Sequence, residues 1–244
     1  MALTLPAPFA VRDGLIVAEL PGGSVRFTTV DTGDLALTAA DPADEIPSPA
    51  ATALAAAIGI PWARWAQDRQ VHAPEVRSTS RPEELHPLTA DHDGQATTLS
   101  GVACVVRVAD CLPIALVAPE GVAMLHGGWR PLAGGIVTRG VAALRALGAT
   151  DVQAAIGPAA GVCCFEAGEE VHAAFADLAT PERPVRRGRN ADLKAVARAQ
   201  LEAAGVHVTH DVDVCTICAD PSDLFSHRRD HGDTGRQAGL TWRS

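Results

Sequence analysis

The sequence has no tyrosine, five phenylalanines and four tryptophans, so aromatic residues make up only 4% of its 244 residues. Basic residues are also few: 20 Lys and Arg stand against 29 Asp and Glu, which gives a formal net charge of −9. This balance argues against the basic stripe with which a general nucleic-acid binder contacts phosphates. We therefore expect small-molecule partners and no nucleic acid.

Long hydrophobic runs are missing as well. No apolar segment reaches the roughly 18 residues that a membrane-spanning helix needs. The opening MALTLPAPFA lacks the basic and apolar regions of a signal peptide. The sequence thus predicts a cytoplasmic protein without a membrane anchor. Thiols stay reduced in that compartment, so we expect the six cysteines to be free.

The apolar residues that are present suffice for one large core. Hydrophobic residues make up 47% of the chain and no linker divides it, which predicts a single domain over residues 1–244. Apolar, β-branched runs within 101–126 predict three central strands covered on both faces. Further strands are expected at 13–20, 22–30, 151–158, 206–214 and 238–244.

Helical patterns separate these strands. Three of them are expected after Pro49, over 134–148 with a stop at Gly148, and over 165–178. The strongest helix is predicted over 190–205, with Asn190 as N-cap and Gly205 at C′. Residues 181–189 (PERPVRRGR) are interpreted as a basic surface loop. Because strands and helices do not alternate strictly, we expect an α+β fold, a mixed β-sheet sandwich with outer helices.

Three short segments carry the residues best suited to chemistry. They are Gln70-Val71-His72, Asp110-Cys111 and His126-Gly127-Gly128-Trp129-Arg130. Cys111 and His126 stand at the ends of two predicted strands, and the glycines after His126 let a ligand approach the backbone. Two imidazoles and a thiolate suit zinc, which leaves a fourth position open in catalytic sites. The same three groups also suit a metal-free Cys–His nucleophile pair.

Longer motifs follow one another in a recognisable order over residues 60–244. They are QVH with His72, VADCLPIAL with Cys111, HGGWR with His126, IGPAAGVCCFEAGEEV, DLKAVARAQLEAAGV, CT at Cys215–Thr216 and LFSHRRDHGDTGRQAGL. Together they resemble the YfiH-type laccase-domain family, which was first described as polyphenol oxidases, is linked to peptidoglycan editing, and is now regarded as purine nucleoside phosphorylases. The resemblance implies an α+β sandwich in which His72, Cys111 and His126 bind a catalytic zinc ion, with copper as the alternative metal.

The resemblance also implies an activity. Purine nucleosides (adenosine, inosine, guanosine and methylthioadenosine) would react with phosphate to give a free base and ribose 1-phosphate, with adenosine deamination as a side activity. Gln70, Arg130, Arg228 and Arg229 are the residues expected to contact substrate. Residues 227–236 (HRRDHGDTGR) are expected to form a loop over the site. A monomer or a homodimer is expected.

The first part of the chain departs from the family pattern. Val30 stands where the family carries an arginine in a TTR-x-GG stretch, and the family's asparagines before the Ala-rich helix are missing. HGGWRP replaces the usual HAGWRG, so that Pro131 removes a backbone donor. These differences leave open a zinc-binding relative that has lost catalysis.

Two other activities fit parts of the pattern. A multicopper oxidase needs many histidines in His-X-His pairs, whereas this chain has nine histidines and no such pair, so the three residues would hold one copper at most. A metal-free hydrolase acting on a peptidoglycan precursor would use Cys111 as nucleophile and His126 or His72 as base.

The remaining cysteine motifs are a CC pair, Cys163 and Cys164, and a CTIC pair, Cys215 and Cys218. CTIC has the spacing of a zinc half-site, but an adjacent CC pair is a poor second half, since four-cysteine sites usually use two C-x-x-C pairs. The sequence therefore favours reduced, partly buried cysteines here.

Overall fold

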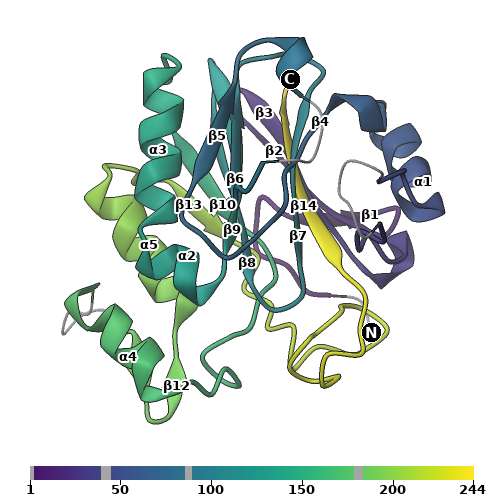
Figure 1. Cartoon of the computed structure of the whole chain (residues 1–244). Helices are drawn as coiled ribbons and strands as arrows, with labels where there is room; N and C mark the ends of the chain where they lie inside the picture. Colours follow the sequence, from purple (N-terminus) through teal and green to yellow (C-terminus); the bar gives the residue numbers. More distant parts are fainter. Residues whose placement is uncertain (1–2, 40–44, 86–89, 179–183) are drawn as a thin grey trace.

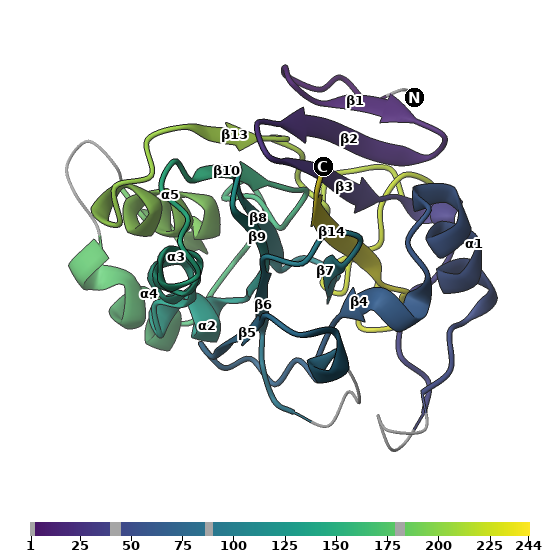
Figure 2. The ribbon, with the colours of Figure 1, turned by 90° about the horizontal axis from the view of Figure 1, so that it is seen from above.

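A computed structural model describes residues 3–39, 45–85, 90–178 and 184–244. Two six-stranded sheets face each other, and helices cover their outer sides (Figures 1 and 2). The first sheet has the strand order β1-β2-β3-β14-β7-β4, and the second has the order β13-β10-β8-β9-β6-β5. The α+β sandwich that the sequence predicts is confirmed. Within the described residues, no helix is both long and apolar enough to cross a membrane.

The first sheet consists of β1 (Ala10–Arg12), β2 (Leu15–Leu20), β3 (Gly23–Thr28), β14 (Gln237–Arg243), β7 (Ala103–Val108) and β4 (Trp65–Ala66). The second consists of β13 (Thr209–Asp211), β10 (Gln153–Ile156), β8 (Leu112–Ala118), β9 (Gly121–Gly127), β6 (Gly94–Thr97) and β5 (Val76–Thr79). The helices are α1 (Pro49–Ile58), α2 (Trp129–Ala133), α3 (Ile136–Ala146), α4 (Glu169–Phe175) and α5 (Leu193–Ala203). A small hairpin of β11 (Arg186–Arg187) and β12 (Asn190–Ala191) precedes α5.

Three apolar layers hold the sandwich together. Between the sheets, Phe27 and Val106 of the first sheet share a buried cluster with Val117 and Met124 of the second. The other face of the second sheet packs on α2, α3 and α5, and the other face of the first sheet packs on α1 (Figure 2). Side chains alternate between the two faces of a strand, so a strand covered on both sides must be apolar throughout.

The three apolar runs within 101–126 are buried along their whole length, as predicted. They do not lie in one sheet, however. β7 belongs to the first sheet, and β8 and β9 belong to the second. Burial on both faces determines the composition of a strand but not its neighbours, so the sequence could not show this division.

The prediction that Asn190 caps the long helix is wrong. Asn190 lies in β12, where its side chain donates a hydrogen bond to the carbonyl of Val162 (2.8 Å). The cap of α5 is Asp192, whose carboxylate accepts from the backbone N–H of Ala195 (2.9 Å). The expected C′ position of Gly205 is confirmed by its φ of +74°.

Two other predicted elements are shorter in the structure. The helix expected over 165–178 starts at Glu169, and a 3-10 turn (Ala176–Leu178) ends it. The strand expected over 206–214 is reduced to β13. Of the predicted loop 181–189, residues 181–183 lie outside the described part, and Arg186–Arg187 form β11 rather than loop.

Candidate metal centre

The strand register brings Cys111 and His126 together. β8 and β9 are antiparallel, and Leu112 lies opposite Gly127. Cys111 directly precedes β8 and His126 is the second-last residue of β9, so both stand at the same edge of the sheet. His72 reaches this edge from the segment between β4 and β5, and its ring centroid lies 4.8 Å from that of His126. The ligand atoms of His72, Cys111 and His126 lie within 4.8 Å of one another.

Asp93 places both histidines. It directly precedes β6, which pairs with β9, and its carbonyl accepts the backbone N–H of His126 (2.7 Å). Its carboxylate lies 2.6 Å from Nδ1 of His126 and accepts the backbone N–H groups of Val71, His72 and Ala73 at 2.8, 3.1 and 3.0 Å. Sequence reasoning missed Asp93, because it lies in a polar stretch 21 residues from His72 and 33 from His126.

The thiol and the imidazole stabilise each other's charged forms. Burial raises the pKa of Cys111, but the charge of His126 and hydrogen bonds from both histidines outweigh burial and lower the pKa to about 6. Burial lowers the pKa of His126, but the thiolate and the Asp93 carboxylate raise it to about 9. Because Nδ1 of His126 faces Asp93, its Nε2 is free for Cys111 or for a metal ion.

The backbone near the three ligands is unusual in two places. His72 adopts a φ of +61°, a conformation uncommon for residues other than glycine. The hydrogen bonds that Val71, His72 and Ala73 donate to Asp93 hold it. At Gly128, a Cβ atom would lie 3.0 Å from Cδ2 of His72 and 3.3 Å from Sγ of Cys111. Glycine therefore leaves just enough space beside the ligands, as its place after His126 predicts.

Asp110, the neighbour of Cys111, is buried and also has a positive φ, +84°. Its carboxylate accepts three hydrogen bonds: from Thr216 Oγ1 (2.5 Å), Ser226 Oγ (2.7 Å) and the backbone N–H of Arg228 (2.7 Å). These contacts join the CT and SHRR motifs, which lie more than a hundred residues later in the chain, to the segment that carries Cys111.

Two cavities meet at His72 and Cys111. The larger one, about 470 Å³, is lined by Ala36, Leu37, Asp68, Arg69, Gln70, His72, Arg107, Val108, Ala109, Cys111, His126, His227, Thr234 and Arg236. The smaller one, about 150 Å³, is lined by His72, Ala109, Asp110, Cys111, Trp129, Arg130, Phe165, Leu193, His227 and Arg228. His72 and Cys111 line both, so a group bound to them would be accessible from either side. The loop 227–236 contributes to both cavities, as expected.

The structure brings three of the four predicted substrate residues to these cavities. The Arg130 guanidinium lies 4.2 Å from the ring centroid of Trp129, and the Arg228 guanidinium lies 5.2 Å from that of Phe165. Both arginines line the smaller cavity. Gln70 lines the larger one, where its amide exchanges two hydrogen bonds with the backbone of Arg107 (2.8 and 2.7 Å).

Arg229 is placed differently. Its guanidinium pairs with the Asp230 carboxylate (2.7 Å) and donates to the carbonyls of Thr216, Ala219 and Leu224. It is not among the lining residues of either cavity. In this position its contacts stabilise the loop 227–236, to which it belongs.

Arg107 lines the larger cavity and was missed from the sequence, where it reads as part of an apolar strand. It is buried, which lowers its pKa to about 10, and it donates to the carbonyl of Leu35 (2.7 Å) and to Gln67 Oε1 (2.6 Å). Arg236 also lines this cavity.

Two of the departures in the sequence, Val30 and Pro131, can be placed in the structure. Val30 begins a 3-10 turn (Val30–Thr32) and is not among the residues that line either cavity. Pro131 lies in the first turn of α2, where backbone N–H groups have no helical partner, so the missing donor costs the helix nothing.

The donor set fits a metal ion. Two nitrogens and one sulfur at one edge of a sheet, open to two cavities, match a catalytic zinc site with three protein ligands and a free fourth position. Asp93 supplies the outer hydrogen bond that histidine ligands ordinarily make. The same donors also accept copper.

Comparisons with known proteins show what the whole chain is similar to. A family model described as "Multi-copper polyphenol oxidoreductase laccase" matches residues 21–244. A purine nucleoside phosphorylase of Xylella fastidiosa is 39% identical over 185 residues, which cover 71% of this chain and 70% of that protein. Purine nucleoside phosphorylase YlmD of Geobacillus stearothermophilus is 35% identical over 202 residues, which cover 75% and 73% of the two chains. The crystal structure of YlmD from the same organism superimposes with a TM-score of 0.82 at 29% identity, over 98% of this chain and 99% of that one.

Proposed function

This chain belongs to the laccase-domain family that the matching model describes, and on that basis we propose that it is a metal-dependent purine nucleoside phosphorylase. The observation that carries the proposal is the group formed by His72, Cys111 and His126, of which the first two line both cavities. The proposed reaction follows from the names of the relatives, and the proposed catalytic residues follow from the geometry of the site.

His72, Cys111 and His126 would hold a zinc ion, with Cys111 as thiolate. A metal ion held by these residues would supply Lewis-acid chemistry, which would also serve the deamination of adenosine. Asp93 keeps Nδ1 of His126 engaged, so that the imidazole presents Nε2. The larger cavity falls within the usual size range of small-molecule pockets, and it would take the nucleoside.

Arg130 and Arg228 would bind phosphate in the smaller cavity. Each guanidinium lies over an aromatic ring, which holds it in place without neutralising its charge. In the reaction, a phosphate oxygen forms a bond to C1′ as the bond from C1′ to the purine nitrogen breaks. The purine leaves with the electron pair and takes up the proton that the attacking dihydrogen phosphate gives up, and two arginines limit charge repulsion on the phosphate side. Gln70 and Arg107 line the nucleoside side, and Arg229 positions the loop of Arg228.

A multicopper centre is not part of the proposal, despite the description of the family model. Within the part of the chain that the structure describes, only two groups of residues could hold a metal: the three ligands above and a cluster of four cysteines. Neither is a multi-histidine centre of the kind that joins several copper ions.

One observation favours a second candidate, a metal-free Cys–His hydrolase. The lowered pKa of Cys111 beside His126 is the condition in which a cysteine acts as nucleophile at neutral pH. Such an enzyme would stay active after metal removal and would lose activity on alkylation of Cys111.

The test combines metal analysis with product analysis. The purified protein is incubated with adenosine with and without phosphate, and adenine, inosine and ribose 1-phosphate are quantified. We expect phosphate-dependent adenine release that a chelator abolishes and added zinc restores.

Cys111→Ala should lose this activity, whereas Cys104→Ala, at a buried thiol away from the site, should keep it. Full activity of Cys111→Ala would refute the assignment. Turnover that needs no phosphate, survives chelation and is lost on alkylation of Cys111 would favour the hydrolase. A zinc-loaded protein without turnover would favour a relative that has lost catalysis.

A further inference from the structure

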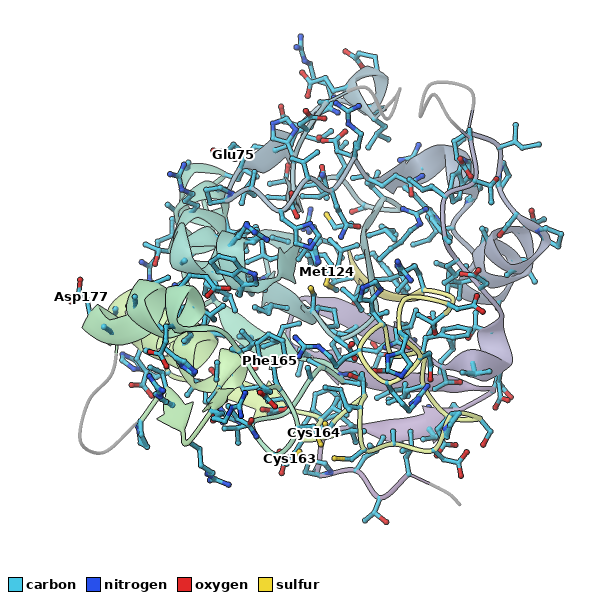
Figure 3. All side chains as sticks on the ribbon, turned by 60° about the horizontal axis from the view of Figure 1, so that its bottom comes forward. Glu75, Met124, Cys163, Cys164, Phe165 and Asp177 are labelled. Atoms are coloured by element: carbon cyan, nitrogen blue, oxygen red, sulfur yellow. The ribbon has the colours of Figure 1, made fainter. Side chains whose placement is uncertain are left out.

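Four of the six cysteines form a second cluster, separate from Cys111 and Cys104. Cys163 and Cys164 lie in the loop after β10, and Cys215 and Cys218 lie in the loop after β13. All four sulfur atoms lie within 4.8 Å of one another. Sγ of Cys218 lies 2.8 Å from that of Cys164 and 3.4 Å from that of Cys163. Figure 3 shows sulfur atoms gathered beside the labelled Cys163 and Cys164.

Two tight turns aim these side chains at one point. The N–H groups of Cys164 and Phe165 both donate to the carbonyl of Gly161 (3.0 and 2.9 Å), which makes a helix-like turn. Neighbouring residues in such a turn diverge by about 100°, so two adjacent thiols can approach one centre from different sides. The sequence alone suggested that an adjacent CC pair is a poor half of a four-cysteine site. The turn removes this objection, because it directs the two neighbouring thiols differently.

The CTIC pair, Cys215 and Cys218, provides the other two thiols of the cluster. The N–H of Ala219 donates to the carbonyl of Cys215 (2.9 Å), which closes a single helical turn. Residues three apart in such a turn share a face, so Cys215 and Cys218 point the same way. The two loops are joined by a parallel bridge between Ala159 and Cys215.

The backbone around the cluster donates hydrogen bonds to sulfur and leaves space for the thiols. The N–H of Gly161 donates to Sγ of Cys215 (3.2 Å), as does the N–H of Cys218. A Cβ atom on Gly161 would lie 3.1 Å from Sγ of Cys163 and 3.3 Å from Sγ of Cys215, so a side chain there would crowd the two thiols. Backbone N–H donors to sulfur are the outer contacts that support a metal-bound thiolate.

We propose that Cys163, Cys164, Cys215 and Cys218 bind one zinc ion in a closed, structural site. Zinc–sulfur bonds of about 2.3 Å in a tetrahedron separate the sulfurs by about 3.8 Å, which lies within the spread of the present positions. A disulfide between Cys164 and Cys218 would use only two of the four thiols. Four thiolates without an open position are the donor set of structural rather than catalytic zinc.

This zinc would hold together two loops that border the proposed active site. It joins the loop that carries Phe165 to the loop that carries Thr216, and Thr216 donates to the Asp110 carboxylate (2.5 Å) beside Cys111. The backbone N–H of Ala160 donates to the carbonyl of Asp110 (2.8 Å). The second metal therefore supports the segment between the two cavities and takes no part in chemistry.

The test is a metal count by elemental analysis on the full chain, purified with a reductant and loaded with zinc. We expect about two zinc ions per chain in the wild type, and about one each in Cys111→Ala and in the double variant Cys215→Ser/Cys218→Ser. Cys104→Ser, the matched control, should keep both. A double variant that binds as much zinc as the wild type would overturn the proposal, whatever the activity at His72, Cys111 and His126.

A second measurement does not depend on the folding of the double variant. Cys111→Ala is loaded with cobalt instead of zinc and its visible spectrum is recorded. A tetrahedral four-thiolate site gives intense sulfur-to-cobalt charge transfer, and we expect this band to remain in Cys111→Ala. A spectrum without thiolate charge transfer would contradict the proposal. So would a disulfide among these cysteines, detected by mass spectrometry of the freshly purified protein after alkylation without reductant, or iron in place of zinc.

Discussion

Oδ2 of Asp93 lies 2.6 Å from Nδ1 of His126, and the same carboxylate accepts the backbone N–H of His72 at 3.1 Å. One side chain thus orients one proposed metal ligand and fixes the backbone of another. Burial raises the pKa of Asp93, but its hydrogen bonds with His126 and with the backbone outweigh burial, and the net pKa is lowered. The carboxylate is therefore charged whenever the site could bind a cation.

The first prediction concerns this carboxylate. Asp93→Asn keeps the shape of the side chain but removes its charge. It also places an amide N–H₂, which cannot accept a hydrogen bond, opposite backbone N–H groups that donate. We expect metal affinity to fall about 10- to 100-fold, the usual loss when an outer-shell partner of a histidine ligand is changed. Competition with a zinc-binding dye measures it, and Asp151→Asn, at an exposed position, is the control. Equal affinity of both variants and the wild type would show that Asp93 does not support the site.

The second prediction concerns the protonation of Cys111 in the metal-free protein. Alkylation by iodoacetamide follows the thiolate fraction, so its rate should have a midpoint near pH 6 instead of the ordinary value of about 8.5. His126→Gln should raise this midpoint by at least about one pH unit, whereas His207→Gln, at an exposed position, should not move it. Peptide-level mass spectrometry separates Cys111 from the other cysteines. A wild-type midpoint above pH 8 would disprove the ion pair.

The same pKa shifts make the stability of the metal-free protein depend on pH. The pKa of Cys111 is lower in the folded state, so the stabilisation by its thiolate is complete above the unfolded value and is lost as the pH falls through about 6. The pKa of His126 is raised, so its contribution is complete below the unfolded value and is lost as the pH rises through about 9. Urea unfolding should therefore show that His126→Gln costs most stability between these limits. Below about pH 6 the cost should fall but not vanish, because protonated His126 still faces the Asp93 carboxylate.

The third prediction concerns Asp110. Asp110→Ala leaves two hydroxyls and one backbone N–H without their buried acceptor, which should lower the free energy of unfolding by about 2 to 4 kcal/mol. Asp213→Ala is the matched control, because Asp213 also has a positive φ (+55°) but is exposed. It should show only the smaller cost of that backbone conformation and of an exposed contact with Lys194 (3.9 Å). Urea titrations measure both, and equal losses would mean that the backbone rather than the hydrogen bonds accounts for the effect.

The fourth prediction separates two neighbouring arginines. Arg228→Ala should raise KM for phosphate at least about tenfold, because a charged hydrogen-bonding partner of a bound anion is worth about 1.5 to 3 kcal/mol. Arg229→Ala should mainly lower the melting temperature, since its guanidinium binds Asp230 and three carbonyls of its own loop. Arg187→Ala, on an exposed strand, is the control. If Arg229→Ala raised KM for phosphate while Arg228→Ala did not, these roles would have to be exchanged.

Local patterns account for the elements that the sequence predicted well. Continuous β-branched runs mark strands buried on both faces, and Gly205 marks the end of α5, because each depends on neighbours in the chain. The choice between Asn190 and Asp192 as N-cap could not be made this way. Both residue types cap helices well, and the pairing of β11 with β12 decides which one precedes the helix.

By itself, the sequence determined the residue types of the proposed site: His72, Cys111 and His126 suit a metal ion or a Cys–His nucleophile pair, and the family resemblance of their motifs implies the metal. Only the tertiary structure decided their support and their surroundings. Asp93 acts because β6 pairs with β9, and the CC and CTIC motifs become one cluster because two loops meet beside Asp110. Such relationships depend on strand register and loop contact between residues far apart in the chain, and residue order alone does not encode them in any local pattern.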